Sequence, residues 1–378
     1  MTEPDASRLL AAAAPANRRN GDDYDVVVIG GGPAGAAAAL ALADRGRSVA
    51  IIHRPGRQEA HVGETVPPAI MRQLARLGLL EVFMADGHTL APGTMVSWGS
   101  ATPYENDFIF DPYGSGWHLD RARFETMLVD AAIASGTDLY ESRRFDCCHS
   151  NTEGWLLRSR GSPLWTVRAT WAIDASGRAA YLARRQGIGR DRCDRLVGLA
   201  RFYTAVTTTD TRTFIESCEI GWWYAAALPY SRAVAVLFTD ADLLPRGRLK
   251  LEQCWNEFLA KTDLVGGHIS AGTAASPLYT AAACSGILSS CAGETWLGIG
   301  DASQSWDPLS GQGITNALAS AVQAAEVISS KNQDRRSMLE GYASRAQREY
   351  RDYLVMRSAN YRRETRWPQS TFWRRRAG

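Results

Sequence analysis

The chain has 378 residues, of which 45% are hydrophobic and 22% are charged, a balance typical of globular proteins. This length accommodates one large domain or two interleaved ones. A formal net charge of +2 gives no general indication of nucleic-acid or membrane binding, and no segment approaches the roughly eighteen consecutive apolar residues of a membrane span.

Residues 1–22 contain a short Ala-rich patch with acidic residues before it and arginines after it. Secretory signals instead have a basic start and a longer apolar core, so we expect a disordered leader here. The seven cysteines are spaced neither for zinc binding nor for a disulfide framework. We interpret them as mostly buried thiols in a reducing compartment, which favours a cytoplasmic location.

The segment YDVVVIGGGPAGAAAALALADRGRSVAIIHRP (24–55) predicts a strand, a glycine-rich turn, an Ala-rich helix and a second strand. A G-x-G-x-x-G pattern between a strand and a helix is specific for a dinucleotide. Its glycines allow a tight turn, close approach of a pyrophosphate and close packing of the helix, and the phosphates lie on free N–H groups at the helix N-terminus. The expected contact residues are Gly30, Gly32, Pro33, Ala34 and Gly35.

The second strand of this pattern normally ends in an acidic residue that binds ribose hydroxyls. Here His53 stands at that place, and Arg54 follows it. An imidazole hydrogen-bonds a ribose more weakly than a carboxylate does, so we expect modest affinity for the dinucleotide. His53 and Arg54 would also suit the 2′-phosphate of NADP, but the later segments argue for a different dinucleotide.

The rest of the chain alternates helical and strand patterns without an internal repeat or a flexible linker. Residues 121–135 predict an amphipathic helix, and a β-rich middle follows. Within it, GWWYAAALP and RAVAVLFTD (221–240) predict a hairpin that turns at Tyr230 and Ser231. Residues 335–363 predict a basic, aromatic-rich helix. We expect the tryptophans of the tail after it to pack against the cofactor domain and its last arginines to be solvated.

Two later segments each place an aspartate at the end of a predicted strand, followed by a glycine-rich turn: IDASGR (173–178) and GDASQSWDPLSGQG (300–313). The second is far longer than the about two to six residues of a bare connection. Together with the N-terminal G-x-G-x-x-G, these motifs make the chain resemble the FAD-dependent aromatic hydroxylase and flavin halogenase superfamily over nearly its whole length. The resemblance implies one bound FAD.

The long loop then has a physical interpretation as a flavin cradle. An aspartate would accept a hydrogen bond from a ribityl or ribose hydroxyl, a proline stiffens the turn, and two glycines let the backbone lie against a flat ring. The following helix points its N–H groups at the ring edge that becomes negative on reduction. The expected residues are Asp301, Pro308, Gly311, Gln312, Gly313 and Ile314. The resemblance adds Arg121 as a cofactor contact and Arg57 near the diphosphate; a solvated charge is the alternative for both.

We therefore predict an α/β fold in which a Rossmann-like FAD-binding domain is interleaved with a β-sheet substrate domain and followed by a C-terminal helical segment. The predicted FAD-binding domain comprises residues 23–98, 117–189 and 285–330. The predicted substrate-binding sheet comprises residues 99–116 and 190–284, and the C-terminal helix and tail comprise residues 331–378.

The motifs also bear on the reaction. Flavin halogenases direct hypohalous acid with a lysine near a W-G element, here APGTMVSWGS (91–100), but this chain has no lysine before Lys250 and no W-x-W-x-I-P segment. Halogenation is therefore disfavoured. The chain resembles instead the flavoproteins that mature tryptophylquinone cofactors of amine oxidases and amine dehydrogenases, which act on a tryptophan of a partner protein. The segments that carry this resemblance are GETVPP (63–68), VSWGS (96–100), GWHLDRARFE (116–125), GWWYAAALP (221–229) and ETRWPQSTFW (364–373).

This resemblance implies an FAD-dependent monooxygenase that hydroxylates an indole ring, on a tryptophan of a partner protein, through a flavin hydroperoxide. NAD(P)H or a separate flavin reductase would supply the electrons. One alternative is a monooxygenase acting on a small or carrier-bound aromatic metabolite. A second is a non-catalytic FAD-binding maturation factor, which the unusual His53 favours and the intact glycines oppose.

Ring hydroxylation requires aromatic or apolar walls and a group that takes the ring proton. Trp222, Trp223 and Tyr224 would supply the walls. Because side chains alternate along a strand, either Trp222 with Tyr224 or Trp223 alone faces the cavity. The candidate proton acceptors adjoin motifs expected near the flavin, and a structural hydrogen bond is the alternative for each. They are Glu64, His118 and Asp307.

Overall fold

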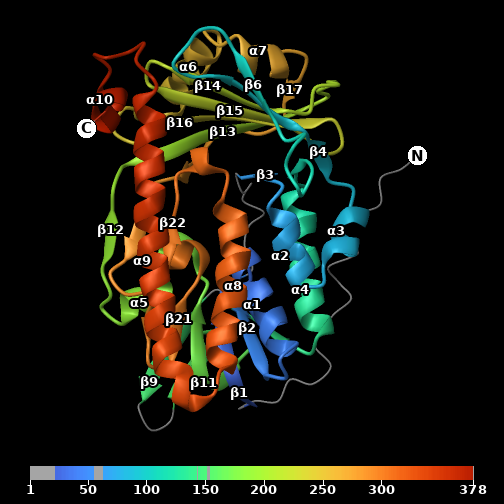
Figure 1. Ribbon diagram of the computed structural model, residues 1–378, viewed down its shortest axis with the longest axis vertical. Coiled ribbons are helices and arrows are strands. Elements are labelled where there is room, and N and C mark those ends of the chain that lie inside the picture. The colour runs from blue at the N-terminus through green and yellow to red at the C-terminus, as the bar shows by residue number, and fades with distance from the viewer. Residues whose placement is uncertain (1–21, 55–62, 143, 151–153, 378) are drawn as a thin grey trace.

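The computed structural model describes residues 22–54, 63–142, 144–150 and 154–377, with a lower layer built on a mixed sheet, an upper layer built on a mostly antiparallel sheet, and a long helix, α9, running along both (Figure 1). Almost all of the expected leader (1–22) and Arg57 lie outside these residues. Among the helices that the structure describes, none is both long enough and apolar enough to cross a membrane.

The lower sheet has the strand order β20-β21-β11-β1-β2-β8, with β10 added beside β11 and β9 beside β10. Strands β21, β11, β1, β2 and β8 are parallel, as in a dinucleotide-binding fold. The strands are β1 (Asp22–Ile29), β2 (Val49–His53), β8 (Asp138–Glu141), β9 (Phe145–Ser150), β10 (Gly154–Ser159), β11 (Thr166–Asp174), β20 (Ala292–Gly293) and β21 (Trp296–Gly298).

Both faces of the lower sheet are covered, and successive residues of β1 point into different cores. Val26 and Val28 pack with α1, α4 and α8, whereas Val27 and Ile29 pack with α5 and β10. Nearly all of α1 is buried, and its alanines allow α8 and α4 to pack closely on it. The helices of this layer are α1 (Pro33–Ala43), α2 (Ile70–Arg76), α3 (Leu80–Ala85), α4 (Arg121–Ala134), α5 (Tyr181–Arg185) and α8 (Gly313–Ser329).

The upper sheet has the order β17-β13-β16-β15-β14-β5-β6, with β18 beside β13. The predicted hairpin is confirmed: β15 and β16 pair, and Tyr230 and Ser231 turn between them with φ of 65° and 53°. Helices α6 (Arg248–Leu259) and α7 (Leu264–Ile269) cover the outer face. The strands are β5 (Gly93–Ser97), β6 (Tyr104–Asp107), β13 (Leu196–Thr204), β14 (Thr213–Cys218), β15 (Gly221–Leu228), β16 (Arg232–Asp240), β17 (Thr273–Ala274) and β18 (Tyr279–Ala282).

Together these layers confirm the predicted fold class, with one change to the expected assignment of segments. The segment 23–98 assigned to the FAD-binding domain includes β5, but β5 pairs in parallel with β14 and belongs to the upper sheet. Two small sheets lie between the layers. They contain β3 (Thr65–Val66), β4 (Thr89–Ala91) and β7 (Gly116–His118), and β12 (Arg190–Arg192), β19 (Gly286–Leu288) and β22 (Gln304–Ser305).

The predicted C-terminal helix is confirmed as α9 (Asn332–Arg362), and α10 (Thr371–Ala377) follows it. With 31 residues, α9 is about 46 Å long and contacts both sheets. Near its start Tyr342 donates a hydrogen bond to the Gly298 carbonyl of β21 at 2.7 Å. Near its end the Asn360 carbonyl accepts one from Trp98 Nε1 at 2.9 Å. The helix therefore ties the two layers together.

Two expectations about exposure and packing are wrong. The tail tryptophans do not pack on the cofactor domain: Trp367 and Trp373 join the inner core of the upper sheet. The last arginines are not all solvated, because Arg376 is only 3% exposed and pairs with Asp240. The expectation of mostly buried thiols is met in part: among the described cysteines, Cys147, Cys218 and Cys291 are buried, whereas Cys193 is exposed.

The Arg376–Asp240 pair generates a stability prediction. Both side chains are at most 3% exposed, and removing one charge leaves the other buried. We expect Asp240→Asn to lower the free energy of unfolding by about 3 kcal/mol in urea titrations. The control is Asp242→Asn, since Asp242 is 39% exposed and binds Arg375 at the surface. It should cost less than about 1 kcal/mol, and equal losses in the two variants would contradict the prediction.

Candidate functional site: a cleft between the two sheets

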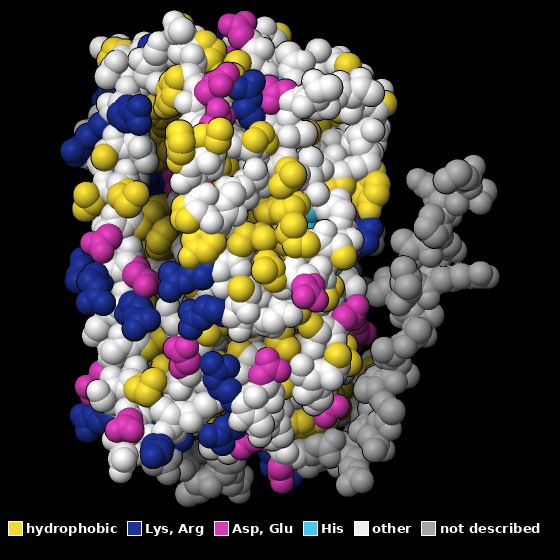
Figure 2. Space-filling view, turned by 45° about the vertical axis from the view of Figure 1, so that its right-hand side comes forward, with side chains coloured by type: hydrophobic (Ala, Val, Ile, Leu, Met, Phe, Trp, Pro, Cys, Tyr) yellow, Lys and Arg dark blue, Asp and Glu magenta, His cyan; other side chains and the backbone are white. Residues whose placement is uncertain are grey.

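A cleft of about 1980 Å³ separates the carboxyl ends of the lower strands from the inner face of the upper sheet. Ligands of parallel α/β sheets bind at that end of the strands. The volume is about twice that of the largest usual small-molecule pockets, so a cofactor and a second molecule can share it. On the side of the molecule shown in Figure 2, hydrophobic side chains gather across the middle of the surface, at the level between the layers.

One end of the cleft is the turn between β1 and α1. Gly30 has a φ of 114°, and a Cβ there would lie 2.3 Å from the Ala175 carbonyl oxygen, so the close contact with β11 requires glycine. Gly32 caps α1, and a Cβ there would meet no atom within 4 Å. The free N–H groups of the first turn therefore face open space that suits a diphosphate.

Most of the cofactor residues expected from the sequence line this cleft. Those that line it are Gly30, Gly32, Pro33, Ala34, His53, Arg54, Arg121, Asp301, Pro308, Gly311, Gln312, Gly313 and Ile314. Gly35 does not: a Cβ at this position would lie 1.8 Å from the Gly30 carbonyl oxygen, so it serves helix packing. Arg121 donates to the Gly63 carbonyl at 2.8 Å and contacts Glu125, so its side chain is held at the cleft edge.

The end of the cleft beside β2 is more basic than the sequence indicated. His53 ends β2 and packs over Gly31, where a Cβ would lie 2.6 Å from the imidazole Nδ1. Three arginines that sequence reasoning missed line the same cleft; they are Arg144, Arg160 and Arg185. They come from the β8–β9 connection, the β10–β11 connection and α5, so no local motif could identify them.

The long loop between β21 and α8 forms the opposite wall of the cofactor part. Gly311 adopts a φ of 63°, and a Cβ at Gly311 or Gly313 would meet no atom within 4 Å. The loop backbone is thus open to the cleft. Asp301 pairs with Arg178 Nε at 3.1 Å, and Arg178 also donates to the Cys284 carbonyl. Arg178, within the quoted DASGR turn, is a cleft residue that the sequence reasoning did not single out.

Asp307 has a structural set of partners. It is 1% exposed, and its Oδ1 accepts a hydrogen bond from the Leu309 amide at 3.0 Å. Its Oδ2 accepts from Arg357 Nε at 3.1 Å and from the Tyr361 hydroxyl at 2.8 Å. These donors come from α9, far along the chain. Because they occupy the carboxylate, Asp307 is poorly suited to accept a proton from a substrate.

His118 is connected to the cleft by a chain of hydroxyl groups. Its Nε2 lies 2.8 Å from the Thr211 carbonyl, which only accepts, so Nε2 carries the proton. Nδ1 is then the acceptor for the Thr65 hydroxyl at 2.8 Å, and Thr65 Oγ1 accepts from the Tyr224 hydroxyl at 2.6 Å. Thr65 and Tyr224 line the cleft. Burial lowers the pKa of His118 to about 4, so it is neutral at pH 7.

Strand alternation and burial decide which of the remaining candidates, the aromatic residues of β15 and Glu64, face the cleft. Trp222 and Tyr224 border the cleft, whereas Trp223 points to the outer face and packs against Trp255 of α6, with ring centroids 4.7 Å apart. Trp223 is therefore not a wall of the cleft. Glu64 does not line the cleft either; it is 2% exposed and accepts a hydrogen bond from the Gly63 amide at 2.9 Å.

Comparisons with known proteins agree with this geometry. Residues 23–246 match the FAD binding domain family. The chain is 33% identical to the putative FAD-dependent oxidoreductase LodB of Marinomonas mediterranea, over 89% of this chain and 91% of LodB. It superposes on the flavin-dependent halogenase CmlS with a TM-score of 0.84 and 25% identity, over 94% of this chain and 68% of CmlS. It superposes on QhpG, a peptidyl tryptophan dihydroxylase essential for tryptophylquinone cofactor biogenesis, with a TM-score of 0.78 and 26% identity, over 94% of this chain and 79% of QhpG.

The burial of His118 predicts a pH dependence of stability. Unfolding returns its pKa from about 4 to about 6.5, so below pH 6.5 the unfolded state binds a proton that the folded state does not. The free energy of unfolding, relative to that of His118→Gln, should fall by up to about 3 kcal/mol between pH 6.5 and pH 4. Urea titrations at several pH values measure it. Parallel profiles of the two proteins would contradict the prediction.

Proposed function

This chain belongs to the FAD binding domain family and is an FAD-dependent oxidoreductase, and from this we propose that it is a monooxygenase that hydroxylates an indole ring. The observation that carries the proposal is the cleft itself, which has a dinucleotide cradle on one wall and aromatic side chains on the other. The substrate would be a tryptophan of a partner protein, and NAD(P)H or a separate flavin reductase would supply electrons.

The residues present fit FAD. The open glycines of both turns and the helix N-termini of α1 and α8 leave room for a diphosphate and a flat ring. When bound and reduced, FAD supplies activated oxygen to the neighbouring substrate. Under this proposal, the residues that hold it are Gly30, Gly32, Pro33, Ala34, His53, Arg54, Arg121, Asp301, Pro308, Gly311, Gln312, Gly313 and Ile314.

The wall opposite the loop between β21 and α8, which we call the flavin loop, suits an indole ring. Trp222 stacks on Phe238 with ring centroids 4.2 Å apart, and both border the cleft. Tyr224 presents its hydroxyl two residues further along the same strand. A flat aromatic substrate can pack against such a wall, because offset and edge-to-face contacts between rings are favourable.

The ring proton has a route away from the substrate. Of the three acceptors considered from the sequence, His118 is the one that a hydrogen-bonded chain joins to the cleft. In this proposal Tyr224 takes the ring proton as its own hydroxyl proton passes to Thr65, and the Thr65 proton passes to His118 Nδ1. The unprotonated Nδ1 of His118 is the acceptor at the end of this chain.

One feature of the cleft supports hydroxylation over halogenation. None of the described residues lining the cleft is a lysine, the residue with which halogenases direct hypohalous acid.

A second feature favours a protein substrate. Beside the cleft-lining Phe108, the side chains of Ile109 and Phe110 are 80% and 94% exposed. Exposed apolar groups next to a site are typical of protein-binding surfaces. QhpG, a structural neighbour, acts on a peptidyl tryptophan.

The proposal is tested by the product. FAD-loaded protein, reduced without oxygen, is mixed with oxygenated buffer, bromide and a set of tryptophan-containing peptides, with N-acetyltryptophanamide as the free aromatic comparison. We expect a peptide to gain oxygen mass from ¹⁸O₂. Bromine in the product would establish a halogenase. Oxygen in N-acetyltryptophanamide alone would favour a small metabolite as substrate, and an unchanged set would favour a maturation factor.

The proton route generates a prediction with a built-in control. Thr65→Val keeps the side-chain shape but removes the hydroxyl between Tyr224 and His118. The rate of peptide hydroxylation should fall about 100-fold, within the usual effect of general acid–base catalysis. Thr65→Ser restores the hydroxyl and should keep most of the rate. The FAD dissociation constant, from flavin fluorescence, should be equal in both. Equal rates in the two variants would exclude the route.

A further inference from the structure

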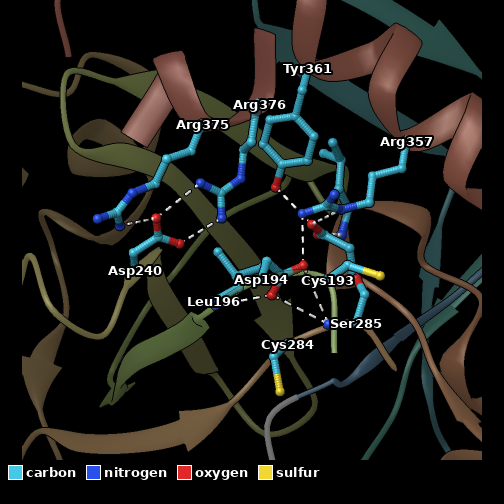
Figure 3. Close-up of polar contacts among 12 residues, drawn as sticks. Cys193, Asp194, Leu196, Asp240, Cys284, Ser285, Arg357, Tyr361, Arg375 and Arg376 are labelled. Carbon is cyan, nitrogen blue, oxygen red and sulfur yellow. Dashed lines mark hydrogen bonds and ion pairs between the residues drawn. The ribbon is translucent and has the colours of Figure 1, made fainter. Parts of the chain in front are cut away.

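A largely buried cluster of charged side chains joins α9, α10 and the upper sheet (Figure 3). Arg357 lies between two carboxylates: its Nη2 is 2.7 Å from Asp194 and its Nε is 3.1 Å from Asp307. Asp194 also accepts hydrogen bonds from the amides of Leu196 and Ser285. The neighbouring Arg376 is paired with Asp240. Arg357 is thus shared between Asp194 and Asp307, whereas Asp240 has two arginine partners, Arg375 and Arg376.

Tyr361 donates the second side-chain hydrogen bond to Asp307, beside that of Arg357. Its hydroxyl lies 2.8 Å from Asp307 Oδ2 and 2.9 Å from Trp222 Nε1. An indole N–H can only donate, so the Tyr361 oxygen accepts from Trp222 and its own proton points to Asp307. The guanidinium groups of Arg357 and Arg376 lie 5.1 and 5.2 Å from the phenol ring, which fixes the ring in place. Burial raises the pKa of Tyr361 well above its ordinary value, so the proton stays on the phenol.

The position of Asp307 gives this contact a consequence for the cofactor. Asp307 lines the cleft directly before Pro308, in the loop that leads to the N-terminus of α8. A reduced flavin carries negative charge, and a carboxylate beside it opposes that charge in a site of low dielectric. The negative charge of Asp307 that its hydrogen-bond donors leave unbalanced therefore affects the stability of the reduced cofactor.

We propose that Tyr361 is a positioning residue that sets the charge Asp307 presents to the bound flavin. It acts through Asp307 and does not touch the substrate. Because Trp222 of the aromatic wall orients the Tyr361 hydroxyl, the same contact fastens the flavin loop to the upper sheet. The inference goes beyond the proposed function, since it concerns the bound FAD and requires no substrate.

The test uses the FAD-loaded protein and the midpoint potential of its flavin, measured by equilibration with redox dyes. Tyr361→Phe removes the hydroxyl but keeps the ring, so the charge of Asp307 is felt more strongly and the potential should become more negative. Asp307→Asn removes the charge at constant size, so the potential should become more positive. The FAD dissociation constant should rise several-fold in Tyr361→Phe, because one hydrogen bond to a charged group is lost.

Tyr350→Phe is the matched control. Tyr350 is on the same helix and is 4% exposed, but its hydroxyl contacts Cys193 Sγ and it does not line the cleft. This variant should leave the potential unchanged. A structural loosening would shift Tyr361→Phe and Asp307→Asn in the same direction, toward the value of free FAD, and would overturn the proposal. So would an unchanged potential in Tyr361→Phe. If Tyr361→Phe does not fold, an unchanged flavin potential in Asp307→Asn is enough to overturn the proposal.

Discussion

Polar contacts at the border of the cleft help to hold the two layers of the molecule together, and most of them involve α9. Across the cleft of about 1980 Å³, side chains of the two sheets do not pack against each other, so these border contacts matter more. Asp307 is central to these contacts, because it is 1% exposed, lies in the loop before α8 and is held by Arg357 and Tyr361 of α9. A buried carboxylate without these partners would be costly, so the position of α9 and the shape of the loop depend on each other.

Strand alternation then divides the aromatic residues of β15 between two tasks. Trp223 faces outward and fills the core under α6, which keeps the upper sheet covered on that side. Trp222 and Tyr224 face the cleft and are both hydrogen-bonded behind it, to Tyr361 and to Thr65. Buried polar groups need such partners. These two hydrogen bonds orient the indole of Trp222 and the phenol of Tyr224 at the wall of the cleft.

Much of the candidate site could be predicted from the sequence because the elements that line the cleft are local. The glycines of the β1–α1 turn, the β15–β16 hairpin and the long loop before α8 are each defined by neighbouring residues. What could not be predicted depends on residues distant in the chain. Thr65 acquires its role from Tyr224 and His118, and Arg376 is buried only because Asp240 lies beside it. The assignment of β5 failed likewise, since its partner strand β14 lies more than a hundred residues later.

Two hydrogen-bonded chains begin on cleft-facing residues of β15 that are two positions apart. One runs from Trp222 through Tyr361 to Asp307 and ends in the loop expected to carry the flavin. The other runs from Tyr224 through Thr65 to His118 and ends at a neutral base. Under the proposed function, β15 is therefore the strand where cofactor, substrate and proton acceptor would meet. Differences in reaction within such a fold are therefore expected in the upper sheet more than in the dinucleotide cradle.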